Sequence, residues 1–366
     1  MLSRIISFIS AWVKPSLGGG GSHAVRYLSY GLWLVLLAGI LVCRYNVVAG
    51  EWYALHFYPV VSAVLSSLTG WIPFSLEEML VVGGAVGMTI YPIIMWRKKK
   101  WRQILRAEVE FLLWIYVWFY WGWGMNYFRQ TFFHRAGVKP LAYDEQQFCE
   151  FLSSYTDSLN GAYYMVSLLD KETVHKEVLQ IFSRIPTHYG LQLPSKVVSP
   201  KRVMFSALYS SVGVLGYMGP FFNEMQLNAR LLTVQYPFTY AHELSHLLGV
   251  SNEAEANFWA YYTCTSSRNP YIRYAGYFGL LPYVAGNAQR LLSEERYSIW
   301  IKSIRPEVIK EFQAERKFWH AQYSPMIGAI QDWAYDHFLK ANQIPAGKKN
   351  YAEVIQMIMA FDANTE

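Results

Sequence analysis

The sequence is poor in cysteine and in charge. Only three of its 366 residues are cysteine, and 16% are charged. Cys43, Cys149 and Cys264 form no CxxC pair, so the sequence predicts neither a disulfide-stapled scaffold nor a thiolate metal site. Cys149 and Cys264 are consistent with one bridge or with two free thiols. The net charge of +6 is concentrated near apolar segments, and we do not interpret it as a nucleic-acid-binding surface.

Apolar residues are abundant instead: 53% of the chain is hydrophobic and 17% is aromatic. Three segments, at about 27–43, 79–96 and 109–125, are near the length that spans a bilayer, and they contain a single charged residue, Glu110. A secretion signal is the alternative for the first segment, but no small-residue cleavage site follows it. The sequence therefore predicts a membrane domain over residues 27–125 with three transmembrane helices.

Basic residues predict the orientation of these spans. The loop "RKKKWRQILR" between the second and third spans is rich in Lys and Arg, which favours the cytoplasmic side. The N-terminal residues 1–26, an amphipathic piece followed by a glycine-rich linker, then also lie in the cytoplasm. We expect an integral inner-membrane protein, with the lipid bilayer as a partner and residues 126–366 forming an extracytoplasmic (periplasmic) domain.

The C-terminal part is expected to be mostly helical with a small β region. Residues 195–238 are rich in Val, Tyr, Gly and Pro, which favours short strands and turns. The predicted fold class is thus a mainly α membrane protein in which three helices precede a mostly helical α+β domain. Apolar residues recur with helical spacing in five segments of that domain: 145–158, 172–183, 239–248, 253–263 and 306–320.

The stretch "YAHELSHLLG" contains the pattern HExxH. His242 and His246 are four residues apart, so on a helix both imidazoles lie on one face, where they can bind one metal ion. Glu243 stands beside them, as in sites where a glutamate takes a proton from a zinc-bound water. The pattern predicts Zn²⁺ held by His242 and His246, with Glu243 as the catalytic general base.

A catalytic zinc usually has a third protein ligand. Asn252 occupies the position where one class of zinc peptidases has a histidine, so a glutamate from the next helix is expected. Gly249 can end the first helix and Asn252 can start the second. Glu255 would then lie at the capping-box position, whereas Glu253 faces the same way as Asn257, which can orient a histidine. We assign the third ligand to Glu253, with Glu255 as the alternative.

The run Glu253, Ala256, Asn257 and Ala260 resembles the ExxA(N/D)xxA signature of several glutamate-zincin families, in which the first glutamate is a ligand. The chain as a whole resembles an uncharacterised family of bacterial membrane proteins, a domain of unknown function with three spans ahead of an HExxH domain. This resemblance implies a zincin-like domain and a zinc metallopeptidase activity. It rests on stretches that include "HFYPVVSAVLSSLTGWIPFSLEEML", "WGWGMNYFRQTF", "GYMGPFFNEMQLN" and "YDHFLKANQIPAGKKNYAEVIQMI".

The expected function is therefore a membrane-anchored zinc metallopeptidase acting on peptide or protein substrates of the cell envelope. A catalytically silent zinc-binding scaffold is the alternative, although a structural site does not need a general base. A peptide substrate would lie along an edge strand from Met218–Arg230 or Leu231–Tyr236. Tyr274, Tyr283 and His320 have the right chemistry to stabilise an oxyanion, but no feature of the sequence selects one of them.

Overall fold

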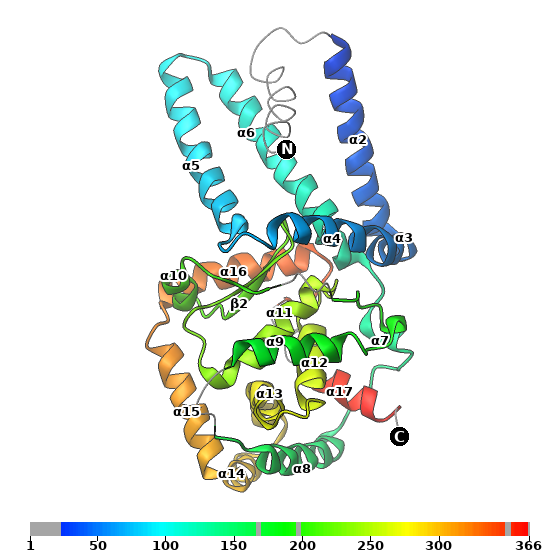
Figure 1. Ribbon diagram of the computed structural model, residues 1–366, viewed down its shortest axis with the longest axis vertical. Helices are drawn as coiled ribbons and strands as arrows, with labels where there is room; N and C mark the ends of the chain where they lie inside the picture. The colour runs from blue at the N-terminus through cyan, green and yellow to red at the C-terminus, as the bar shows by residue number, and fades with distance from the viewer. Residues whose placement is uncertain (1–22, 166–169, 195–198, 348–352, 365–366) are drawn as a thin grey trace.

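The computed structural model describes residues 23–165, 170–194, 199–347 and 353–364 (Figure 1). These residues are mainly helical and form one small mixed sheet, as predicted. The predicted amphipathic segment and most of the glycine-rich linker lie outside the described residues.

Three helices project together from one end of the molecule: α2 (His23–Tyr45), α5 (Leu76–Arg97) and α6 (Trp101–Gly122) (Figure 1). By length and composition, α5 is apolar enough to cross a membrane, and none of its apolar window is buried inside the protein. A second span is possible if α2 and the helical segment after it, which bends away by 109°, are taken as one. One or two apolar helices indicate a membrane association, while the third span stays a prediction.

The first turns of α6 explain why it differs from α5. They carry Arg102, Arg106, Glu108 and Glu110, and Arg106 pairs with Glu110 at 2.7 Å. The uncharged stretch of this helix is left with residues 111–122, which is shorter than the roughly 20 residues of a full span.

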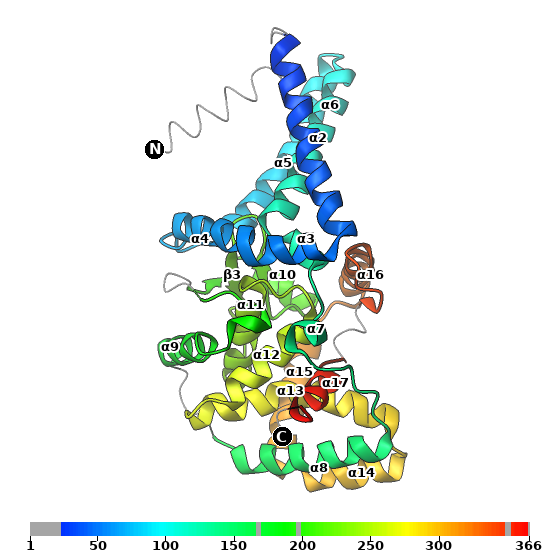
Figure 2. The ribbon, with the colours of Figure 1, turned by 90° about the vertical axis from the view of Figure 1, so that its right-hand side faces the viewer.

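The chain between α2 and α5 lies crosswise under the projecting helices as α3 (Val47–Trp52), η1 (Tyr53–Phe57) and α4 (Tyr58–Thr69) (Figure 2). Buried polar contacts attach this layer to the C-terminal domain. The Tyr58 hydroxyl donates to the carbonyl of Leu247 at 2.8 Å, and Arg129 pairs with Glu51 at 2.7 Å. A separate apolar cluster fills the junction, formed by Ile40, Tyr53, Tyr58, Val117, Tyr120, Trp123, Met125 and Phe128.

The C-terminal domain packs its helices around α12 and α13, whose Trp259, Tyr274 and Phe278 are almost fully buried. All five predicted helical segments are helices in the structure. The helices are α7 (Phe132–Ala136), α8 (Glu145–Ala162), α9 (Lys171–Phe182), α10 (Ser206–Ser211), α11 (Tyr236–Leu247), α12 (Glu253–Thr265), α13 (Pro270–Leu291), α14 (Glu294–Ser303), α15 (Pro306–His320), α16 (Pro325–Ala341) and α17 (Val354–Asp362), with the 3₁₀ segments η2 (Gly124–Phe128), η3 (Thr187–Tyr189) and η4 (Thr233–Gln235).

The predicted β region forms a three-stranded sheet in the order β1 (Lys201–Arg202), β3 (Glu224–Leu227), β2 (Gly216–Gly219). β3 is parallel to β1 and antiparallel to β2, so β2 is an edge strand. The prediction of a strand at Leu231–Tyr236 was wrong. This segment turns through η4 into α11, because the Gln235 side chain accepts from the Leu232 amide at 3.2 Å and closes the turn.

Candidate metal centre

The helix α11 carries the HExxH pattern and is buried on nearly all sides. It ends where Gly249 adopts a φ of 96°, a left-handed conformation that favours glycine. The amides of Gly249 and Val250 donate to the carbonyls of His246 and Ser245, both at 3.1 Å, which closes the helix end. This turn brings the Val250 carbonyl back to the ring of His246.

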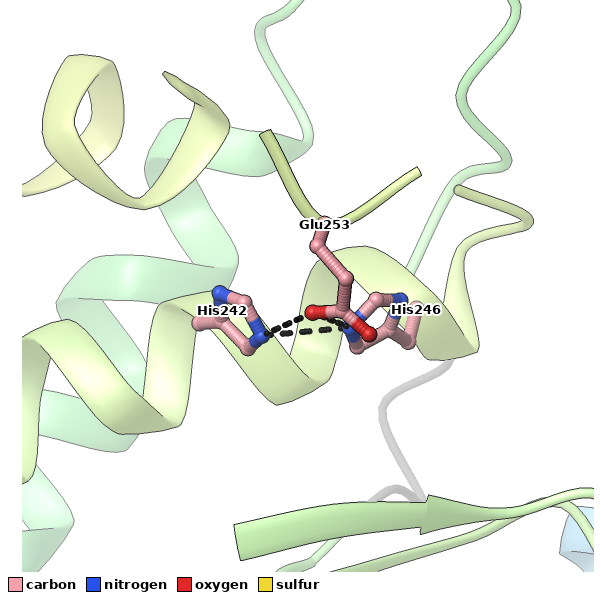
Figure 3. Close-up of side chains that lie close together, drawn as sticks. All are labelled: His242, His246 and Glu253. Carbon is pink, nitrogen blue, oxygen red and sulfur yellow. Dashed lines mark hydrogen bonds and ion pairs between the residues drawn. The ribbon is translucent and has the colours of Figure 1, made fainter. Parts of the chain in front are cut away.

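His242 and His246 point the same way from α11, and the carboxylate of Glu253 reaches both rings (Figure 3). The two Nε2 atoms are 3.1 Å apart. Glu253 Oε2 lies 3.3 Å from Nε2 of His242 and 3.4 Å from Nε2 of His246. The structure therefore brings together the three side chains that the sequence analysis assigned to the metal.

Hydrogen bonds on the far side of each ring define the imidazole tautomers. His246 Nδ1 lies 2.8 Å from the Val250 carbonyl oxygen, which can only accept, so this Nδ1 carries the proton. His242 Nδ1 lies 2.8 Å from Asn257 Oδ1, as predicted for an orienting residue. In the neutral tautomers both Nε2 lone pairs then face each other and the Glu253 carboxylate. Three acceptors directed at one point are favourable only if a cation or protons lie between them.

Glu253 is the first residue of α12, and it is held from two directions. Asn252 caps the helix by accepting from the Glu255 amide at 2.9 Å, as predicted. The Tyr335 hydroxyl of α16 donates to Glu253 Oε1 at 2.5 Å, which leaves Oε2 directed at the histidines. No sequence motif predicts a role for Tyr335, although this residue opens one of the stretches that carry the family resemblance.

Glu255 faces away from the histidines. Its carboxylate pairs with Arg135 at 2.5 Å and accepts from Trp259 Nε1 at 3.1 Å, and both members of the ion pair are almost fully buried. The capping-box role suggested for Glu255 was therefore wrong, because the buried Arg135 guanidinium attracts its carboxylate away from the cap. Within the described residues, Glu255 belongs to the packing of α12 against α7 and not to the His242 cluster.

Burial and charge together set the protonation of the cluster. Burial disfavours the charged imidazolium of His246, but the adjacent Glu253 carboxylate outweighs it and raises the pKa of His246 to about 9. Burial alone would raise the pKa of Glu253. The two imidazoles reverse this effect and hold the pKa of that carboxyl well below its usual range. The cluster thus favours an anionic Glu253 facing positive charge.

Glu243 lines the same cleft as the histidines, from a position on α11 that faces the edge strand β2. A Cβ placed on Gly216 would be 2.9 Å from Glu243 Cγ and Oε1, so the strand can pass this close only without a side chain. Among the described residues no hydrogen-bond donor reaches the Glu243 carboxylate, and burial raises its pKa to about 7. A buried carboxylate with this pKa is suited to general acid–base chemistry near neutral pH.

A cleft of about 760 Å³ surrounds these residues. Glu243 and the three ligand candidates line it together with β2, the end of α6 and one face of α16. Edge strand β2 contributes Gly216, Tyr217 and Met218 to the lining. The strand predicted within Met218–Arg230 coincides with this edge only at Met218 and Gly219, and the other strand in that range, β3, is the central strand of the sheet. The cleft is large enough for several residues of an extended peptide.

The chain matches the family model "Protein of unknown function (DUF3810)" over residues 53–359. It belongs to the DUF3810 family. The predicted membership of an uncharacterised family is thus confirmed. Neither the curated proteins nor the solved structures include a significant match to the chain.

Other predicted residues of this DUF3810 protein have different positions. Tyr283 lines the cleft and its hydroxyl lies 3.5 Å from Asn257 Oδ1. Tyr274 instead donates to Glu311 at 2.6 Å, and neither it nor His320 lines the cleft. Cys149 and Cys264 are both free thiols, so the structure has no bridge between them.

Proposed function

We propose that this DUF3810 protein is a membrane-anchored, zinc-dependent metallopeptidase. The observation that carries the proposal is the convergence of His242, His246 and Glu253 on one point of a cleft. Their separations of 3.1 to 3.4 Å are close to the ~3.3 Å that separates ligand atoms about 2.0–2.1 Å from a tetrahedral zinc. Two imidazoles and one carboxylate form the donor set of catalytic zinc sites, which keep a fourth position open.

Zinc, when bound, would lower the pKa of a water molecule and polarise the carbonyl of the scissile peptide bond. The protein residues would then carry out the proton transfers. Glu243 takes a proton from the attacking water and passes it to the leaving amine, for which its pKa of about 7 is suited. Asn257 and the Val250 carbonyl hold the two rings in the tautomers that present Nε2 to the metal.

The edge strand β2 supports a peptide as the substrate. One side of β2 pairs with β3, and its residues 216–218 line the cleft beside Glu243. An extended peptide can add to such an edge through main-chain hydrogen bonds, independent of its sequence. A catalytically silent scaffold would not require a buried carboxylate without a hydrogen-bond donor beside an open strand edge, so the peptidase is the better supported function.

The test is to purify the protein in detergent, to measure its zinc content and to assay it with mixed-sequence fluorogenic peptides. We expect about one zinc per chain, lost in His246→Ala, and hydrolysis that Glu243→Gln reduces at least ~100-fold while zinc is retained. Glu315→Gln is a matched control, because Glu315 is a carboxylate of the same cleft that hydrogen-bonds Gln235. Equal loss in both variants, or wild-type zinc in His246→Ala, would contradict the proposal.

For the membrane part we propose a cytoplasmic N-terminus, three spans and a periplasmic catalytic domain. The basic residues at 97–106 support this orientation, since they lie at the end of α5, in the short connection and in the first turns of α6, at the outer ends of both helices (Figure 1). A reporter fused near Lys100 is expected to be cytoplasmic, and one fused after Glu366 extracytoplasmic. The reverse pattern would place the cleft in the cytosol.

A further inference from the structure

Helix α16 exposes an apolar stripe. Met326, Ile330 and Trp333 follow one another at helical spacing, and their exposed fractions are 74%, 64% and 66%. Such a stripe on a helix that is otherwise packed into a domain indicates a surface that is covered in the working protein.

Two further elements present apolar side chains at the same level. α4 exposes Val60, Val64 and Leu68 along one face, and Trp71 just after it is 75% exposed. Leu208 of α10 is also exposed. Figures 1 and 2 place α4, α10 and α16 at the level where α2, α5 and α6 meet the rest of the molecule, with α4 and α16 lying crosswise.

The position of these faces identifies the bilayer as their occupant. These faces come from three distant parts of the chain, yet all lie around the ends of the apolar helices. Helix α5 follows shortly after α4 in the chain, and no residue of its apolar window is buried inside the protein. Amphipathic helices that lie flat beside a spanning helix, with tryptophan on the apolar side, are typical of the membrane interface. We define α4, α10 and α16 as the interfacial ring.

The other face of α16 forms a wall of the cleft. Gln331, Tyr335 and Phe338 line the cavity, and Tyr335 donates to Glu253 at 2.5 Å. Phe119 and Trp123 at the end of α6 line the cavity beside this face, and the rings of Phe119 and Phe338 pack edge to face with centroids 5.7 Å apart. The end of a projecting helix and a helix of the interfacial ring therefore meet in one wall of the cleft.

We propose that the interfacial ring rests on the bilayer surface and that the cleft receives the segment of a membrane-anchored polypeptide that lies next to the bilayer. The identity of the substrate rests on the proposed peptidase function, whereas the contact with the bilayer does not. A peptide tethered in the same membrane enters the cleft from the side at a high effective concentration. A free peptide must instead approach from the periplasm.

The first experiment tests the membrane contact alone. Ile330 and Ile299 are changed one at a time to cysteine, in a Cys43→Ser, Cys149→Ser background, and labelled with an environment-sensitive fluorophore. Ile299 is the matched control, because it is 62% exposed against 64% for Ile330 but lies on α14, at the far end of the molecule (Figure 1). In phosphatidylethanolamine–phosphatidylglycerol vesicles we expect brighter, blue-shifted emission at position 330 only, quenched by nitroxide-labelled lipid. The same emission at both positions would overturn the membrane contact.

The second experiment tests the substrate class with fluorogenic peptides, either free or anchored in the same vesicles by an N-terminal palmitoyl chain. Ile330→Asp is expected to slow cleavage of the anchored peptides about tenfold while leaving cleavage of the free peptides unchanged, and Ile299→Asp is expected to change neither. Equal cleavage of anchored peptides by both variants would overturn the substrate assignment. If the wild-type protein cleaves neither form, the peptidase function fails, and the labelling result still decides the membrane contact.

Discussion

Substituting each of the two neighbouring glutamates of α12 by glutamine is expected to produce opposite defects. Glu253→Gln removes the only carboxylate of the proposed metal centre and touches no buried ion pair other than those with the two histidines. Glu255→Gln leaves the proposed ligands in place but removes the partner of a buried arginine. One variant should lose zinc, and the other should lose stability.

The magnitudes follow from the geometry of each carboxylate. Arg135 and Glu255 are 2.5 Å apart with 3% of either side chain exposed, and removing one partner of such a pair costs about 3–5 kcal/mol. Glutamine still accepts from Arg135 and Trp259, so we expect a value of about 3 kcal/mol. Residues that only orient a ligand change metal affinity by roughly 10- to 100-fold, so the loss of Glu253 as a ligand should weaken zinc binding by more than ~100-fold.

Two measurements on the detergent-solubilised protein separate these effects. Zinc affinity is determined by competition with a chelator, and the free energy of unfolding is determined by denaturant titration after zinc removal. We expect weak zinc binding for Glu253→Gln, and near-normal zinc binding with a lower metal-free stability for Glu255→Gln. If Glu255→Gln lost zinc while it unfolded like the wild type, the assignment of Glu253 would be refuted.

Three further predictions concern the surroundings of the centre. Gly216→Ala should reduce peptide hydrolysis about 100-fold without loss of zinc. The added Cβ would be 2.9 Å from Glu243 Cγ and Oε1 and would displace this carboxylate. Unchanged turnover would contradict the assignment of Glu243 as the general base. Asn257→Ala should weaken zinc affinity roughly 10- to 100-fold in chelator competition, because it frees the His242 ring. Burial raises the pKa of Glu315 from 4.5 to about 7, so the folded state binds this proton more tightly and loses stability as pH rises from 4.5 to 7. In denaturant titrations, the free energy of unfolding of Glu315→Gln relative to the wild type should therefore rise by about 2–3 kcal/mol between pH 4.5 and pH 7. A difference between variant and wild type that does not change with pH would contradict the prediction.

The sequence alone determined the parts of the centre that depend on local helix geometry. His242 and His246 are four residues apart, so any α-helix places their rings on one face. Gly249 and Asn252 are strong signals for a helix end and a helix start, and both boundaries are where these residues predict them. The apolar segments likewise predicted the projecting helices, because the length of an uncharged run can be read directly from the chain.

Only the tertiary structure decided which glutamate faces the histidines. Glu253 and Glu255 are two residues apart and point to nearly opposite sides of α12, so the choice depends on how α12 is rotated against α11. That rotation is set by distant partners: Arg135 draws in Glu255 from 120 residues away, and Tyr335 meets Glu253 from 82 residues away. No helix was predicted for residues 325–341, and only the packing shows that α16 exposes an apolar stripe while its other face lines the cleft. Contacts between residues far apart in the chain leave no periodic signal, and for this reason they could not be predicted from the sequence.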